Sequence, residues 1–166
     1  MSGQFESAGM LFGRRTYDDL VGYWLSTSEP NPFTDILART PKYVASRDPA
    51  AALPYPNSTL LAGEAVDTVA ALKRSGDGGL VVLGSGALVR DLAAAGLVDR
   101  YVLTILPIVL GRGARLFDST YAELELESST TSPTGIVVAS YRVLLRPVPS
   151  PTLVPWAPTP VARSTA

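Results

Sequence analysis

The sequence of 166 residues contains no cysteine and no histidine. Without cysteine there is no disulfide, no thiolate nucleophile and no metal site built on thiolates. Without histidine, Ser-His-Asp triads and imidazole general bases are excluded, as are most transition-metal sites. Any catalysis must therefore use carboxylates, hydroxyls, guanidinium or ammonium groups, or a cofactor that carries the difficult chemistry. A cofactor fits this composition best, and we expect no metal site.

An excess of charge is also missing. The formal net charge is -1, with a pI near 5.4, which gives no basic footprint for nucleic acid. No apolar run approaches the roughly 20 residues that span a bilayer, and the first residues lack the pattern of a signal peptide. We therefore expect a cytoplasmic protein that binds neither nucleic acid nor membranes.

The first hundred residues alternate between strand and helix patterns. Strands are predicted at residues 8–12, 42–45, 58–61 and 80–83, and helices over 16–26, 64–74 and 87–95. Thr16 is the expected N-cap of the first helix, and Gly96 the expected C-cap of the last. The stretch 28–41 contains Pro30, Pro32 and Pro41, which predicts a loop.

Beyond residue 98 only strand patterns remain. They cover residues 99–110, with a bulge or an early end at Pro107, and then 124–127 and 136–145. This order predicts an α/β fold with a mostly parallel central sheet and an antiparallel hairpin at its carboxyl-terminal edge. Residues 147–166 hold six prolines and no core pattern, so we expect a domain over residues 1–146 followed by a disordered tail.

The strongest candidate site is the turn Gly84-Ser85-Gly86, between a buried apolar strand and a helix. Glycines at a strand end let backbone amides approach a phosphate, and the following helix adds its dipole. The turn lacks the third glycine of the Rossmann fingerprint. Taken alone, a plain tight turn is about as good an explanation as a phosphate site.

Two further turns carry arginine at predicted strand ends. Gly13-Arg14-Arg15-Thr16 opens a helix, where guanidinium groups and free amides suit phosphates. Ser46-Arg47 offers a hydroxyl and a guanidinium for a ribose 2′-phosphate, although a polar turn is at least as common. Each turn is weak evidence by itself, and three of them in one small domain favour a dinucleotide site.

Parts of the sequence resemble a known superfamily. Gly13-Arg14-Arg15-Thr16 is similar to the Gly-Arg-x-Thr signature of dihydrofolate reductases. The run from Val82 to Leu88, the Ala95–Asp99 stretch and the Pro107–Gly113 stretch resemble the reductase domain of the bifunctional riboflavin-biosynthesis deaminase–reductase and its stand-alone relatives. The resemblance covers roughly residues 8–146.

The resemblance implies a dihydrofolate reductase-like three-layer fold and an NADPH cofactor. It implies that the first turn meets the adenosine and pyrophosphate part, that Ser46 and Arg47 approach the 2′-phosphate, and that the mid-chain turn cradles the pyrophosphate. The cofactor-binding residues expected on this basis are Gly13, Arg14, Arg15, Thr16, Ser46, Arg47, Gly84, Ser85, Gly86, Ala87 and Leu88. No catalytic residue is assigned.

Two departures from the family pattern shape the functional expectation. Gly84 stands where riboflavin-pathway reductases have a substrate-binding Glu, which favours the stand-alone relatives. Only Met1 to Gly9 precede the Gly-Arg-x-Thr segment, so we expect the sheet to lack a central strand and the reaction centre a covering loop. The resemblance implies an NADPH-dependent reductase of a small pyrimidine- or pterin-like substrate; the alternative is an inactive nucleotide-binding or dimerising pseudoenzyme. Relatives commonly form homodimers, and residues 102–110 offer an apolar face for one.

Overall fold

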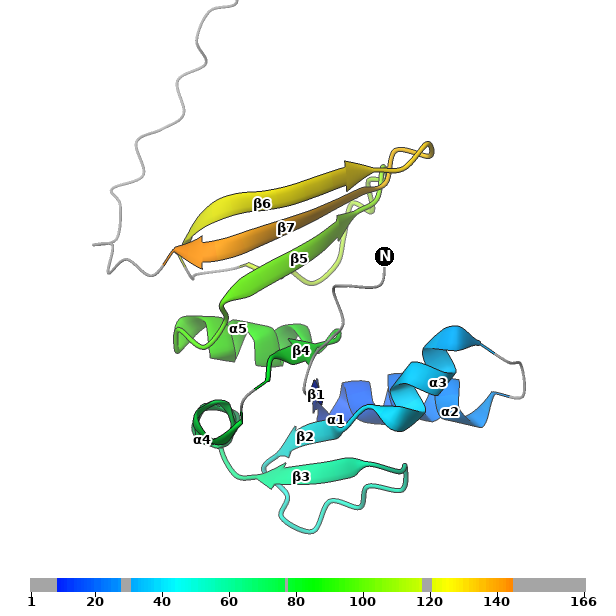
Figure 1. The fold of residues 1–166 in the computed structure, drawn as a ribbon, viewed down its shortest axis with the longest axis vertical. Coiled ribbons are helices and arrows are strands. Elements are labelled where there is room, and N and C mark those ends of the chain that lie inside the picture. Colours follow the sequence, from blue (N-terminus) through cyan, green and yellow to red (C-terminus); the bar gives the residue numbers. More distant parts are fainter. Residues whose placement is uncertain (1–8, 28–30, 77, 118–120, 145–166) are drawn as a thin grey trace, which may run out of the picture.

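The computed structural model describes residues 9–27, 31–76, 78–117 and 121–144. Helices and strands alternate up to residue 94, and only strands follow (Figure 1). In chain order the elements are β1 (Gly9–Gly13), α1 (Arg14–Thr16), the π-helical turn η1 (Tyr17–Val21), α2 (Gly22–Ser26), α3 (Pro32–Arg39), β2 (Lys42–Ser46), β3 (Ser58–Ala62), α4 (Ala65–Ser75), β4 (Leu80–Val82), α5 (Gly86–Ala94), β5 (Arg100–Ile105), β6 (Glu123–Thr131) and β7 (Val137–Leu144).

The first four strands form a parallel sheet in the order β3-β2-β1-β4. Gly13 lies opposite Ala45 at one end of β1, and Gly9 lies opposite Leu80 at the other. Because all four strands run the same way, their carboxyl ends meet at one edge, which is where open α/β sheets bind ligands. This α/β fold with a parallel central sheet is the predicted one.

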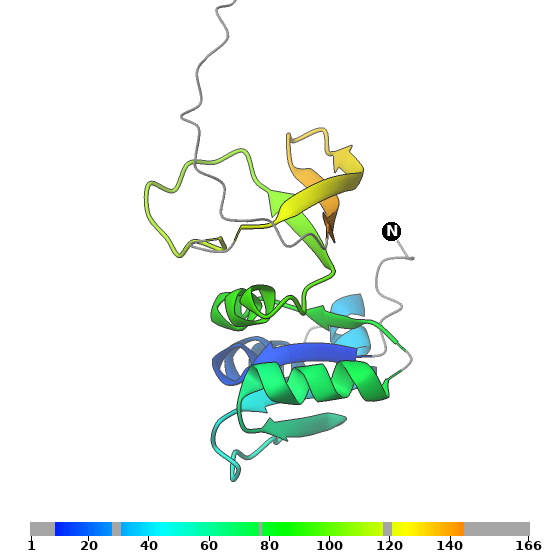
Figure 2. The same cartoon turned by 90° about the vertical axis from the view of Figure 1, so that its left-hand side faces the viewer.

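Helices cover both faces of the parallel sheet, because side chains of a strand alternate between its faces. Met10 and Phe12 of β1 pack toward α1–α3, whereas Leu11 packs toward α4 and α5. Figure 2 shows α4 lying across one face of β1, with α5 beside it. The arrangement is the expected three-layer sandwich of helices, sheet and helices.

The last three strands form a separate antiparallel sheet in the order β5-β7-β6. The hairpin was expected at the edge of the parallel sheet, but no ladder joins the two sheets within the described ranges. There, β4 pairs only with β1 and β5 only with β7. Each sheet therefore has two edge strands without a further partner among the described residues, β3 and β4 in the first sheet and β5 and β6 in the second. The expected lack of a central strand stays a prediction.

The predicted loop over residues 28–41 is wrong for its second half. Residues 28–30 lie outside the described part, but α3 occupies Pro32–Arg39. Asn31 caps the helix, with its Oδ1 accepting from the backbone N–H of Phe33 at 2.8 Å. Pro32 occupies the first turn, where proline lacks only an N–H that would have no partner. Pro32, which the sequence predicts to lie in a loop, starts a helix instead.

Replacing Asn31 by alanine should lower the free energy of unfolding by about 1 kcal/mol, because the Phe33 amide loses its capping acceptor. Asn31→Asp keeps a side-chain oxygen and serves as the control. Urea unfolding followed by circular dichroism measures both. Equal losses in the two variants would contradict the capping role.

The other predicted ends of helices and strands agree with the structure only in part. Thr16 is not the N-cap of the first helix, since the helical segment already begins at Arg14 after an extended Gly13. The C-cap of α5 is Ala95, one residue before the predicted Gly96. Gly96 follows it in the left-handed conformation with a φ of +67°, and the N–H of Leu97 donates to the Leu92 carbonyl at 2.9 Å. β5 ends at Ile105, before Pro107, as predicted.

β5 and the stretch that follows it expose apolar side chains, as expected for residues 102–110. The exposed ones include Val102, Ile105, Ile108, Val109 and Leu110. A homodimer that covers them stays a prediction, and sedimentation equilibrium is its test. None of the described helices is long and apolar enough to cross a membrane.

Candidate functional site

The first and the mid-chain glycine turns meet at the carboxyl edge of the parallel sheet. They follow β1 and β4, which are neighbours. The backbone N–H of Gly13 donates to the Ser85 hydroxyl oxygen at 2.9 Å, across 72 residues of sequence. This bond fixes one turn against the other.

The mid-chain turn has a backbone that needs glycine. Gly84 has a φ of +66°, and a Cβ there would lie 3.1 Å from Cγ2 of Thr16. Ser85 is also left-handed, with φ 55° and ψ 50°, a conformation that costs a non-glycine residue free energy. Its hydroxyl bond to Gly13 compensates for this cost and explains why a serine stands here.

An open pocket of about 500 Å³ lies between the two turns. Eight of the eleven predicted cofactor-binding residues line it. They are Gly13, Arg14, Arg15, Thr16, Ser85, Gly86, Ala87 and Leu88. Gly84 lies directly beside them, in contact distance of Thr16.

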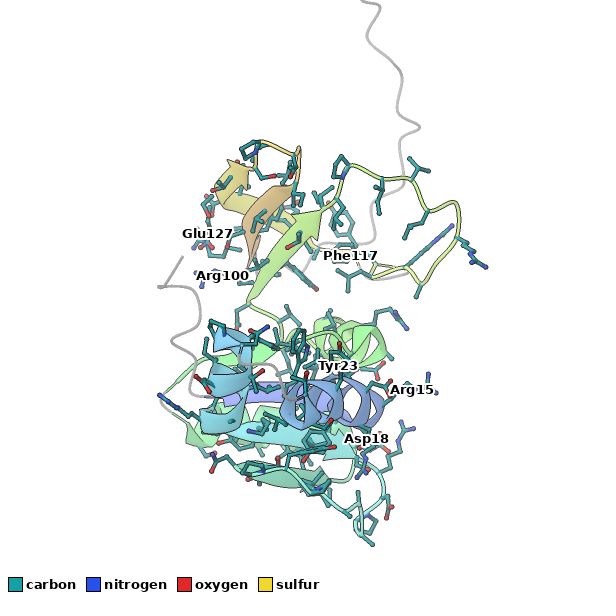
Figure 3. All side chains as sticks on the ribbon, turned by 90° about the vertical axis from the view of Figure 1, so that its right-hand side faces the viewer. Arg15, Asp18, Tyr23, Arg100, Phe117 and Glu127 are labelled. Atoms are coloured by element: carbon teal, nitrogen blue, oxygen red, sulfur yellow. The ribbon has the colours of Figure 1, made fainter. Side chains whose placement is uncertain are left out.

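The two adjacent arginines of the first turn have different surroundings. Nε of Arg14 donates to Oδ2 of Asp18 at 2.8 Å, and Nη1 donates to the Ala52 carbonyl at 2.8 Å. The Asp18 hydrogen bond raises the pKa of Arg14. Within the described part of the chain, Arg15 has no hydrogen bond or ion pair, and its side chain projects outward (Figure 3). Arg15 is therefore the guanidinium available to a ligand.

Ser46 and Arg47 do not line this pocket, so the three predicted turns do not form a single cluster. The Ser46 hydroxyl accepts from the backbone N–H of Asp48 at 3.1 Å. Arg47 donates to both carboxylate oxygens of Glu64, at 2.9 and 3.1 Å. These hydrogen bonds raise the pKa of Arg47 and lower that of Glu64.

Glu64 is the residue near the site that the sequence did not single out. It lies just past the carboxyl end of β3, one strand beyond Ser46. In the sequence, Glu64 only marks the start of a helical pattern, and an acidic residue at a helix start is explained by the helix dipole. Its position at a strand end beside another strand-end arginine is the signal that could have found it.

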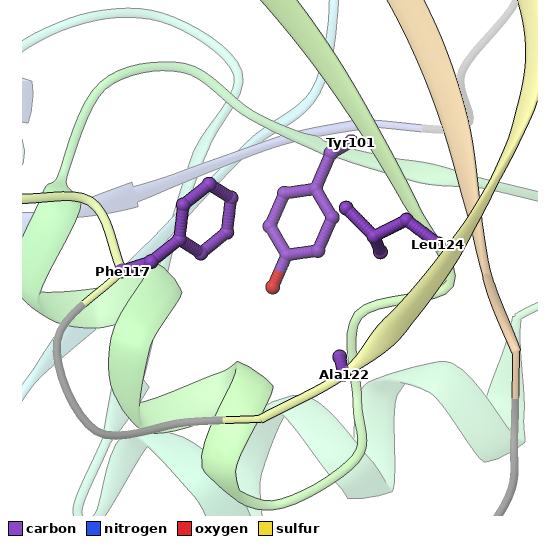
Figure 4. A pocket seen from close by; sticks show the side chains of 4 residues that line it. All are labelled: Tyr101, Phe117, Ala122 and Leu124. Carbon is purple, nitrogen blue, oxygen red and sulfur yellow. The ribbon is translucent and has the colours of Figure 1, made fainter. Parts of the chain in front are cut away.

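A second, smaller hollow of about 190 Å³ lies in the antiparallel part of the molecule. Tyr101, Phe117, Ala122 and Leu124 line it, and Figure 4 shows the Tyr101 ring between Phe117 and Leu124. Burial raises the pKa of Tyr101. Apart from this phenol, the described side chains that line the hollow are apolar, so none of them carries a charge for a charged ligand.

The pocket between the two turns suits a phosphate group. The first amides of α5 have no partner within a helix, and an anion at a helix N-terminus is favoured by these N–H groups and by the dipole. Arg15 adds a positive charge at the same place. Gly84 and Gly86 are both exposed, so a ligand can reach their backbone, and the residues present fit the pyrophosphate of a dinucleotide.

The element order and the glycine turn at the carboxyl edge define a dihydrofolate reductase-like α/β protein. Solved structures support this fold. A protein from Shewanella sp. PV-4 assigned to riboflavin biosynthesis matches with a TM-score of 0.66 and 23% identity, covering 84% of this chain and 75% of that one. A pyrimidine reductase-like protein from Corynebacterium diphtheriae matches with a TM-score of 0.56 and 14% identity, over 83% and 76% of the two chains.

Dihydrofolate reductase from Enterococcus faecalis, solved with NADP(H), matches with a TM-score of 0.58 and 13% identity, over 81% of this chain and 73% of that one. The model of the RibD C-terminal domain matches residues 25–138. The chain therefore belongs to the RibD C-terminal domain family, in agreement with the resemblance seen in the sequence. Among curated proteins, none matches this sequence.

Proposed function

We propose that this protein is an NADPH-dependent reductase of a small pyrimidine- or pterin-like substrate, of the type that reduces 5-amino-6-(5-phosphoribosylamino)uracil. The observation that carries the proposal is the pocket where the Gly13 and Ser85 turns meet beside Arg15. Membership of the RibD C-terminal domain family supports a reductase-type activity.

The residues of the pocket act by binding and orientation. The α5 amides and Arg15 hold the pyrophosphate, and the Gly13–Ser85 bond fixes their relative position. The nicotinamide, when bound, supplies the hydride that reduces the substrate. No carboxylate is among the described residues that line the pocket, so these residues bind and orient a ligand and do not transfer a proton.

The second candidate is a nucleotide-binding pseudoenzyme, which the same pocket would serve, since its described residues act by binding alone. Titration of the purified chain with NADPH and NADH, followed by oxidation assays on aminouracil and dihydropterin substrates, separates the two. Binding with turnover supports the reductase. Binding without turnover supports the pseudoenzyme. If neither nucleotide binds, both candidate functions are wrong.

Replacing Arg15 by glutamine should weaken NADPH binding by about ten- to a hundredfold, because a charge-assisted hydrogen bond to phosphate is lost. Arg39→Gln, an exposed arginine on α3, is the matched control and should bind as the wild type does. Fluorescence titration with NADPH measures both variants. An unchanged affinity in Arg15→Gln would show that the phosphate binds elsewhere.

A further inference from the structure

The ion pair between Arg47 and Glu64 lies beside the proposed pocket. Ala45 of β2 is the register partner of both Gly13 and Leu61, so the ends of β1, β2 and β3 are adjacent. Neighbouring strands are about 4.8 Å apart, which places Arg47 one strand away from the Gly13 turn. The N–H of Gly63 donates to the Ser46 carbonyl at 3.0 Å and holds the two strand ends together.

Both members of the pair reach solvent. The Arg47 side chain is 81% exposed and the Glu64 side chain 61%. The two hydrogen bonds of the pair use two of the Arg47 donors in a fork geometry that a phosphate would also use. A phosphate that binds Arg47 must therefore displace Glu64 or lie beside its negative charge.

A carboxylate distinguishes two forms of a nicotinamide dinucleotide. A 2′-phosphate competes with the carboxylate for the guanidinium and is repelled by the negative charge of the carboxylate. A ribose 2′-hydroxyl instead donates a hydrogen bond to the carboxylate. We propose that Glu64 sets the nucleotide preference of this site by holding Arg47 and so lowering the advantage of NADPH over NADH. The inference rests on the proposed function, because it concerns the same dinucleotide.

The test compares four probes: NADPH, NADH, adenosine 2′,5′-bisphosphate and AMP. The members of each pair differ by the 2′-phosphate. In Glu64→Gln, we expect the preference for the 2′-phosphorylated probe to rise about tenfold, because the competing charge is gone and an exposed ion pair is weak enough to be broken. Adding Arg47→Gln to this variant should abolish the gain.

Glu125→Gln is the matched control, since Glu125 also forms an exposed ion pair, with Arg142 on the antiparallel sheet. It should leave the preference unchanged. The Glu64 side chain makes no capping bond to α4, so Glu64→Gln should fold. If both nucleotides bind but Glu64→Gln leaves their ratio within twofold of the wild type, the inference is wrong. If the wild type binds none of the four probes, the proposed function fails, and the inference with it.

Discussion

Replacing Lys42 by methionine is expected to lower the free energy of unfolding by about 2–4 kcal/mol, although methionine suits a buried position better than lysine does. The Lys42 side chain is fully buried, and its Nζ donates to the Leu37 carbonyl at 2.7 Å and to the Thr40 carbonyl at 2.9 Å. These carbonyls belong to the end of α3, which has no further intrahelical donors for them. Methionine would remove this donor from both carbonyls, of which the Leu37 bond is buried and the Thr40 bond half-buried.

Urea unfolding of the two variants Lys42→Met and Lys73→Met tests this role. Lys73 is the other lysine of the chain, and its side chain is 32% exposed in an ion pair with Asp99. Its replacement should cost at most about 1 kcal/mol, as exposed pairs do. Similar losses in the two variants would contradict a special role for Lys42.

The contribution of Lys42 also depends on pH. Burial lowers the pKa of Lys42 from its ordinary value of 10.5. Between the lowered folded value and 10.5 the unfolded chain binds the proton more tightly, so unfolding becomes less favourable as the pH rises through this window. The difference in stability between wild type and Lys42→Met should therefore grow with pH there. A neutral amine keeps two N–H donors, which is enough for the two carbonyls.

Replacing Gly84 by valine is expected to cost about 2–4 kcal/mol of folding free energy, since a β-branched residue is strained at positive φ and its Cβ would press on Thr16. The strain can be relieved only by moving the turn that carries Ser85. That movement would break the bond between the Ser85 hydroxyl and the Gly13 amide. We therefore expect NADPH affinity to fall at least about tenfold as well.

Gly79→Val is the matched control for this substitution. No atom lies within 4 Å of a Cβ at Gly79, and its φ is not in the left-handed region. Thermal unfolding and NADPH titration of both variants give the two readouts. A Gly84→Val protein with wild-type stability would show that the turn does not need the left-handed conformation.

The strands and most helices of this fold follow from the sequence because their cause is local. The alternation of Met10, Leu11 and Phe12 between two helical layers is visible in the apolar run itself. The prediction for the stretch around α3 was wrong because a proline either breaks a helix or starts one, and only the cap at Asn31 decides which of the two Pro32 does. The burial of Lys42 could not be predicted, since its partners are carbonyls, which every residue possesses.

The candidate site was predictable in position but not in its pairings. Strand ends place Gly13 and the Gly84 turn at one edge, and the structure brings them together. The difference between Arg14 and Arg15 depends on Asp18 and Ala52, and the latter lies 38 residues away in a loop. The pairing of Arg47 with Glu64 spans 17 residues and joins the ends of two strands, and no local pattern encodes it.

The division into two sheets implies that the molecule does not open as one cooperative unit. Residues 9–82 contain every strand of the parallel sheet, and residues 100–144 contain every strand of the antiparallel one. Each sheet is therefore built from one continuous part of the chain. Contacts such as the Lys73–Asp99 ion pair connect the two parts, but within the described residues no ladder does. Backbone amides of β5–β7 should therefore exchange with deuterated water through openings that leave the nucleotide pocket intact.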